Sequence, residues 1–322
     1  MRIRTFTPIL CAGLLGACLV ALPGCRPQAN DEVVAPADTR AARKPAQAVR
    51  QLTAHLRANE LEAFAMEAVP PEMHERLVVA WREGRTRWPL DELPFGGRLP
   101  AILAALSAPG SEKKLQQTFD RQYAGAGREL RSAAQTLGVF GTRYVAEEGD
   151  YSEDERLHYT QLIAAASQWG MEAPLGDRNR AGHSIAQLAA AARRTGLASA
   201  ADFQEAGMAA SLRKLGPFAA AFKVVLLRYG LDLNADLDTL DASLQQQTGD
   251  EAKVRMRYRF AGSDIDTVVG MRRVDGRWYV ADFLRHAEAA IARPLPPAPV
   301  PDPAATAAPG PAQAAPATTP RR

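Results

Sequence analysis

Cysteine is almost absent from this chain, and its three copies all lie within the first 25 of 322 residues. They are Cys11, Cys18 and Cys25, so residues 26–322 contain no thiol. A thiolate zinc site, a cysteine nucleophile and a disulfide framework are therefore excluded for that part of the chain. A hydrophobic core alone must hold its fold, and about 250 residues are long enough to build one.

Local catalytic motifs are missing as well. The five histidines show no His-Glu-x-x-His spacing, and no Gly-x-Ser-x-Gly occurs. The stretch GAGREL at 125–130 lacks a third glycine and follows no expected strand, which excludes a dinucleotide-binding loop. With 39 basic and 36 acidic residues, the charge is nearly balanced and does not indicate a nucleic-acid partner. We expect neither a cofactor nor a metal site.

The N-terminus has the pattern of an export signal. Arg2 and Arg4 precede an apolar run, which ends in LPGC at Cys25. This ending resembles the lipobox of bacterial lipoproteins. The resemblance implies a signal peptide over residues 1–24 and a diacylglycerol on the thiol of Cys25. LGAC, ending at Cys18, is a second candidate for the lipid site, and an ordinary secretory signal is the alternative to both.

The resemblance to lipoproteins also predicts where the protein resides. Arg26, rather than an aspartate, follows Cys25, which by resemblance favours an outer-membrane lipoprotein facing the periplasm. A soluble periplasmic protein is the alternative. Residues 25–43 would form the lipidated tether. At the other end, residues 293–322 are rich in proline and alanine, a composition that predicts an extended, disordered tail.

Between the tether and the tail, residues 44–235 are predicted to be helical. Apolar side chains recur there at helical spacing, for example at Leu115, Phe119 and Tyr123. Ser152 and Glu155 predict a capping box at the start of one helix. They belong to the acidic run EEGDYSEDE at 147–155, which we interpret as favourable charge at a helix N-terminus rather than a calcium site or an acid–base pair.

Residues 236–292 change to a period of two, which indicates strands. In KVRMRYRF at 253–260, apolar and basic side chains alternate. A two-residue turn at Ala261-Gly262 would pair Tyr258 with Ile265, and the Asp-Gly signal in VDGR predicts the next hairpin. A further strand is expected within residues 240–248. The predicted buried face consists of Val254, Met256, Tyr258, Ile265, Val269, Met271, Trp278 and Val280.

These elements predict an α+β fold, in which a mainly helical body packs on a C-terminal antiparallel meander of three or four strands in one domain, with a short terminal helix. The stretch from GDEAKVRMRYRF to DGRWYVADF resembles the last strands of the nuclear-transport-factor-like α+β fold. AVRQLTAHLRANELEAFA at 48–65 is similar to its opening helix. That family is functionally diverse, so the resemblance implies a fold and no particular activity.

Two groups of residues are candidates for binding. WREGRTRWP contains Trp81, Arg85, Arg87 and Trp88, a combination that either stacks on ligands or packs two indoles in a core. The arginine face of the meander, with Arg255 and Arg257, is the second candidate surface.

The sequence therefore favours a non-enzymatic, lipid-anchored envelope protein. Such a protein would bind the membrane through its lipid and contact an envelope protein or an anionic polymer. The alternative is a cell-wall or ester hydrolase with a dispersed carboxylate, arginine or histidine site. A deep pocket lined by convergent ionisable groups would favour the hydrolase, and a shallow surface would favour the binding protein.

Overall fold

A computed structural model describes residues 42–93 and 96–295 of the chain. All of these residues belong to one of two units into which the chain divides, Thr39–Arg322. The predictions for the signal peptide, for Cys25, and for the tail beyond residue 295 concern residues outside this part, and they remain predictions.

The helical body comes first along the chain. Proline in the first turn of α1 and of α3 suits the start of a helix, because those N–H groups have no partner within the helix. Ser152 forms the predicted capping box with Glu155, and Ser199 forms a second one with Asp202. The elements are α1 (Pro45–Ala58), α2 (Leu61–Glu67), α3 (Pro71–Arg82), η1 (Leu90–Glu92), η2 (Gly96–Arg98), α4 (Leu99–Ser107), α5 (Ser111–Gln122), α6 (Gly127–Glu147), α7 (Glu153–Glu172), α8 (Arg178–Thr195), α9 (Ala200–Arg228) and α10 (Leu233–Asp238).

The sheet follows, with strands β1 (Asp241–Thr248), β2 (Glu251–Phe260), β3 (Ser263–Val274) and β4 (Arg277–Val280), and helix α11 (Ala281–Ala292) ends the fold. Neighbouring strands are antiparallel, in the order β1-β2-β3-β4. Tyr258 lies opposite Ile265, and Met271 lies opposite Val280, as the alternation predicted. The predicted α+β class is confirmed, with four strands.

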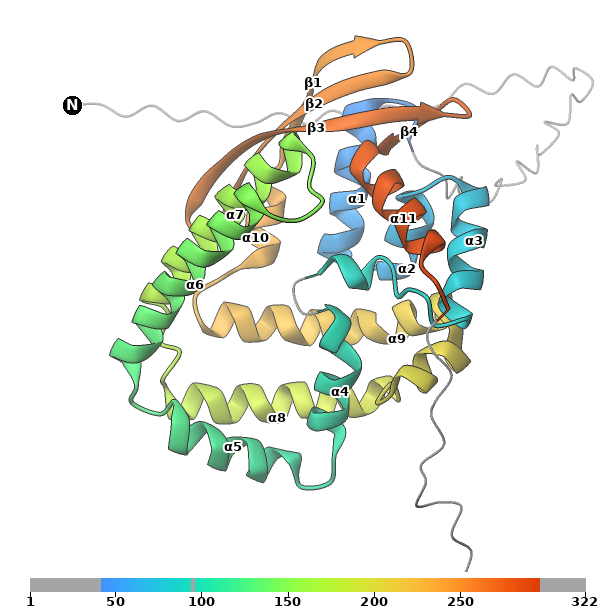
Figure 1. Ribbon diagram of the computed structural model, residues 1–322. Coiled ribbons are helices and arrows are strands. Elements are labelled where there is room, and N and C mark those ends of the chain that lie inside the picture. The colour runs from blue at the N-terminus through green and yellow to red at the C-terminus, as the bar shows by residue number, and fades with distance from the viewer. Residues whose placement is uncertain (1–41, 94–95, 296–322) are drawn as a thin grey trace, which may run out of the picture. The chain divides into compact units, whose positions relative to one another are not determined.

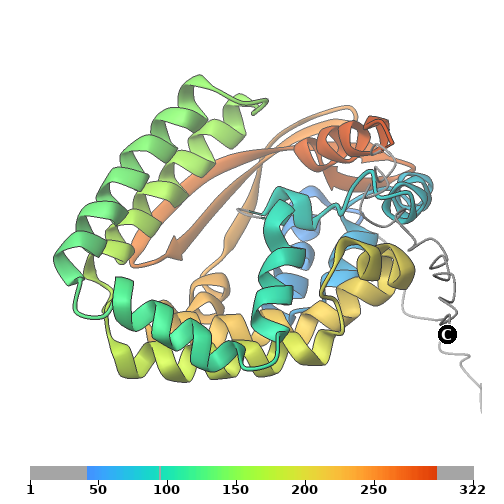
Figure 2. The same cartoon turned by 60° about the horizontal axis from the view of Figure 1, so that its bottom comes forward.

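The helices surround the concave side of the sheet (Figures 1 and 2). Helix α1 contacts β1, β2 and β4, α7 contacts β3, and α11 packs on β3 and β4. Helices α5, α8 and α9 form a layer at the opposite end of the body, and α4 runs between that layer and the region of η1. The concave face of the sheet is thus covered by helices, some of which lie far from it in the sequence.

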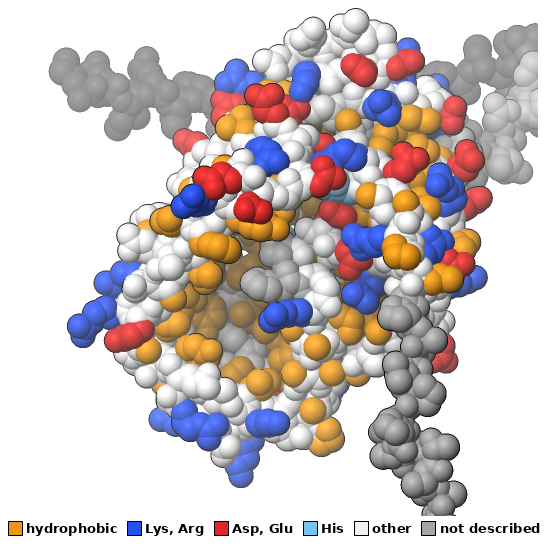
Figure 3. Space-filling model, in the orientation of Figure 1, with side chains coloured by type: hydrophobic (Ala, Val, Ile, Leu, Met, Phe, Trp, Pro, Cys, Tyr) orange, Lys and Arg blue, Asp and Glu red, His pale blue; other side chains and the backbone are white. Residues whose placement is uncertain are grey.

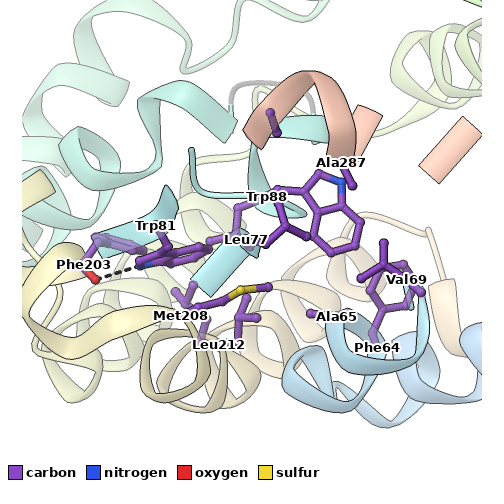
Figure 4. Packing of buried hydrophobic residues seen from close by; sticks show 14 of the residues in the cluster. Phe64, Ala65, Val69, Leu77, Trp81, Trp88, Phe203, Met208, Leu212 and Ala287 are labelled. Atoms are coloured by element: carbon purple, nitrogen blue, oxygen red, sulfur yellow. Dashed lines mark hydrogen bonds between the residues drawn. The ribbon is translucent and has the colours of Figure 1, made fainter. Parts of the chain in front are cut away.

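The core has two parts. In one, Val49 of α1 packs with Val254, Met271 and Trp278 of the sheet. The other lies among the helices, where the rings of Trp81 and Trp88 are buried (Figure 4). The indole Nε1 of Trp81 donates a hydrogen bond to the Phe203 carbonyl of α9 at 2.8 Å, which fixes α3 against α9.

Helix α7 reaches the backbone of the sheet directly. The side-chain amide of Gln161 donates to the carbonyl of Asp266 at 3.0 Å and accepts from its N–H at 3.0 Å. These groups lie on the side of β3 away from β2. Strand β4 pairs only with residues 271–274 of β3, so a helix rather than a strand meets β3 at Asp266.

Candidate functional site

A cavity of about 260 Å³ lies between the apolar face of the sheet and helices α1, α2, α7, α10 and α11. Most of its wall is apolar, and the rings of Phe64 and Phe283 meet there edge to face, with their centroids 5.8 Å apart. Small-molecule sites are typically concave, mainly apolar, and furnished with a few placed polar groups. The other apolar lining residues are Val49, Leu52, Leu56, Leu237, Leu240, Met256, Val269 and Val280, and the polar ones are Thr53, Asp154, Glu155, His158, Tyr159, Tyr258 and Asp282.

The periodicities of the sequence explain how these side chains converge. Glu155, His158 and Tyr159 are spaced three and four residues apart, so they share one face of α7. Tyr258 and Val269 follow the inward alternation of β2 and β3. Both are only partly buried, as is Val280, whereas the other five residues of the predicted sheet face are buried. All three side chains border the cavity, as does the buried Met256.

His158 and Tyr258 form a hydrogen-bonded pair in the cavity wall. His158 Nε2 lies 2.5 Å from the Tyr258 hydroxyl, and the two rings meet edge to face. Burial lowers the pKa of His158 to about 4. Burial also raises the pKa of the Tyr258 hydroxyl well above its ordinary value. At neutral pH both groups are therefore uncharged, and the pair offers hydrogen bonds without a net charge.

A second polar group sits beside this pair and is ionic. His286 of α11 bridges two carboxylates, with Nδ1 2.8 Å from Glu92 and Nε2 3.3 Å from Glu155. Hydrogen bonds to Glu155 and Glu92 raise the pKa of His286 to about 9, so it is a cation at neutral pH. Burial alone would raise the pKa of Glu155, but hydrogen bonds from His286 and the Ser152 N–H outweigh it and lower that pKa.

The carboxylates that line the cavity all have partners. Glu155 also pairs with Arg285, Asp154 pairs with Lys253, and Asp282 accepts from the Ser152 hydroxyl at 3.0 Å. Within the described residues, no lysine or arginine lines the cavity. A bound carboxylate or phosphate would therefore lose its hydration without gaining a cationic partner, because the nearby cations already pair with these carboxylates. The geometry suits an uncharged ligand that can hydrogen-bond to His158 or Tyr258.

Trp81 and Trp88, from the first predicted binding surface, are in the core. Each indole is 1 % exposed, so neither ring is available for stacking on a surface ligand. Arg85 donates to the Ile291 carbonyl of α11 and pairs with Glu83, while the backbone N–H of Arg87 donates to Asp91 at 2.7 Å. The segment therefore joins α3 to α11.

The second predicted surface, the arginine face of the sheet, is exposed and internally paired. Arg255 donates to Asp266 at 2.8 Å, and Arg257 donates to Asp241 at 2.9 Å. Arg257 and Asp266 lie opposite each other in the register, but the ion pair of Asp266 runs diagonally to Arg255. A partner would compete with these pairs for the guanidinium groups.

The residues of the cavity were not singled out from the sequence as a site. Glu155 was assigned only the role of a helix start, which it does fill. The available signal was the sharing of one helical face by Glu155, His158 and Tyr159, together with the inward position of Tyr258. His158 and Tyr258 are 100 residues apart, and no local motif connects them.

Residues 42–93 and 96–295 contain neither a cluster of possible metal ligands nor a helix that could cross a membrane. No cluster of three or more His, Cys, Asp or Glu side chains there could hold a metal ion. Over the same residues, no helix combines the length and apolar character that a bilayer crossing requires.

Comparison with known proteins found no relative of this chain. No protein-family model matches the chain, and neither a curated protein nor a solved structure is significantly similar to it.

Proposed function

We propose that the domain is a non-enzymatic binding module for a small, uncharged, mainly apolar molecule, held in the cavity between the sheet and α1, α7 and α11. The observation that carries this proposal is the apolar cavity of about 260 Å³ with one uncharged His158–Tyr258 pair in its wall. Apolar burial would supply the affinity, and the pair would orient one polar group of the ligand.

The state of the ionisable groups supports binding over catalysis. A general acid or base needs a carboxylate or imidazole that is free to exchange a proton with the ligand. Glu155 and Asp282 are held by Arg285, His286 and Ser152. These bonds hold the two carboxylates in fixed orientations, which is a structural role.

Replacing Tyr258 with phenylalanine is expected to weaken binding of hexanol about fivefold. The change removes one neutral hydrogen bond, worth about 1 kcal/mol, and keeps the ring. Displacement of the uncharged fluorophore Nile red by hexanol measures the affinity. Tyr123→Phe is the matched control, because Tyr123 does not line the cavity and its loss should change nothing. Equal hexanol affinity in wild type and Tyr258→Phe would contradict the role of the pair.

The hydrolase is a second candidate, favoured by the convergence of His158, Glu155 and Asp282 on one cavity. Turnover of short-chain esters or peptidoglycan by the purified protein, lost in His158→Gln, would establish it and remove the binding module from consideration. The binding proposal expects no turnover above the rate without protein.

We also propose that the chain is exported and held at the outer membrane through a lipid on Cys25. The support is the charged start, the apolar run and the LPGC ending. A Cys25→Ser variant should lose incorporated radiolabelled fatty acid and leave the membrane fraction, whereas Cys18→Ser should keep both. Loss of lipid in Cys18→Ser but not in Cys25→Ser would assign the lipid to Cys18. Absence of lipid from the wild type as well would support an ordinary secretory signal.

A further inference from the structure

Helix α6 carries a row of large apolar side chains that nothing in the described residues covers. Leu137, Phe140 and Tyr144 are 68 %, 66 % and 45 % exposed. They are spaced three and four residues apart, so they form one stripe along the helix. The Phe140 and Tyr144 rings stack with centroids 6.3 Å apart. Exposed apolar stripes of this kind commonly mark binding surfaces.

The stripe lies on the side of α6 and α7 that faces the cavity. A Cβ added at Gly138 would meet Ser167, and one at Gly141 would meet Ile163, which defines the face of α6 that packs on α7. At 100° per residue, the stripe lies about a quarter turn from that face. The stripe therefore points to the same side of the α6–α7 pair as Glu155 and Tyr159 of α7. Figure 3 shows a hollow in the surface here, with hydrophobic side chains on its wall.

Aromatic side chains lie between the stripe and the cavity. Tyr144 is close enough to Tyr151 to raise its pKa electrostatically, although burial is the larger cause. The Tyr151 ring meets the ring of Tyr159 edge to face at 5.5 Å, and Tyr159 stacks on His158. Gly141 of α6 lies beside Ile163 of α7, and Ile163 comes four residues after Tyr159. At a rise of 1.5 Å per residue, Phe140 and Tyr159 are therefore separated by about 6–8 Å along the α7 axis.

We infer that the ligand is an uncharged lipid with one long, flexible apolar chain. Its hydroxyl group would bond to Tyr258, and the chain would leave the cavity past Tyr159 and lie on Tyr144, Phe140 and Leu137. This inference rests on the proposed function, because the cavity must hold the polar end. The hydroxyl is specified because the Tyr258 oxygen keeps a lone pair for a ligand donor in either tautomer of His158.

Continuity and size decide in favour of a single chain over a protein segment. The stripe leads towards the cavity past Tyr151 and Tyr159, so one molecule can cover both. A helix with its side chains is roughly 10 Å across and would not enter a cavity of 260 Å³. Charge selects the head group, because no lysine or arginine among the described residues lines the cavity and a carboxylate would be desolvated there without a cationic partner.

The test compares dodecanol, hexanol and dodecanoate, each displacing Nile red from the purified protein below the concentrations at which the lipids aggregate. Dodecanol should bind wild type at least about tenfold more tightly than hexanol, because the additional methylenes are buried on α6. Dodecanoate should bind more weakly than dodecanol. In a Leu137→Ser/Phe140→Ser variant, the gain of dodecanol over hexanol should largely disappear, while hexanol affinity stays the same.

Val139→Ser is the matched control, since Val139 is 68 % exposed on a different face of α6. It should keep the full preference for dodecanol. Circular dichroism would verify that both variants are folded. An unchanged dodecanol-to-hexanol ratio in the double variant, or an equal loss in the control, would overturn the inference. So would a double variant that loses binding to neutral phospholipid vesicles but not to dodecanol, since the stripe would then contact a membrane surface. Failure of hexanol to bind wild type would instead contradict the proposed function.

Discussion

Replacing Trp81 with alanine is expected to lower the free energy of unfolding by about 3–5 kcal/mol. The indole is 1 % exposed and packs on the ring of Phe203, with centroids 6.3 Å apart. Its Nε1 donates to the Phe203 carbonyl, so the substitution also leaves a buried carbonyl without this donor. Guanidinium chloride unfolding followed by circular dichroism measures the change.

Val79→Ala is the control for this result. Val79 lies two positions earlier on α3 and is 51 % exposed, so its truncation should change the free energy of unfolding by no more than about 0.5 kcal/mol. If Trp81→Ala were as mild as Val79→Ala, the assignment of Trp81 to the core would be wrong.

The stability contributed by His286 is expected to depend on pH. Its pKa is raised to about 9 in the folded protein, against 6.5 for an ordinary histidine. A raised pKa means that folding favours the protonated form, so the contribution is complete below about pH 6.5 and is lost as the pH rises through about 9. It is of the order of 3 kcal/mol at its maximum.

Comparison of wild type with His286→Gln across this range measures the effect. The wild type should be more stable at pH 6, and the difference between the two proteins should narrow steadily towards pH 10. Glu92→Gln, which removes the negative charge 2.8 Å from Nδ1, should retain only part of the pH-dependent contribution. A difference that is constant over this range would show that His286 does not titrate between the two carboxylates.

The sheet was predictable from the sequence because its signals are local and mutually consistent. The alternation in KVRMRYRF and the turn at Ala261-Gly262 define one register, in which Tyr258 meets Ile265 and Arg257 meets Asp266. A shift by one residue would have placed the arginines inside. The capping box at Ser152 was predictable for the same reason, since it depends on residues within one turn.

The site was not predictable in this way, because it depends on how helices pack. Val49, His158, Tyr258 and Phe283 come from four elements, and periodicity does not reveal which elements meet. The WREGRTRWP segment illustrates the same limit. Two indoles beside arginines are compatible with a binding surface or with a core, and only the position of α3 against α9 and α11 distinguishes them.

The bonds between Gln161 and Asp266 bear on how far this protein can be shortened. One amide supplies both a donor and an acceptor to the edge of β3 that faces away from β2, at a position that β4 does not reach. A sheet edge stripped of such cover can recruit a strand from another molecule and so start aggregation. A truncated version without α6 and α7 would expose this edge along with the apolar face beneath it. Efforts to crystallise or engineer a smaller domain should therefore retain both helices.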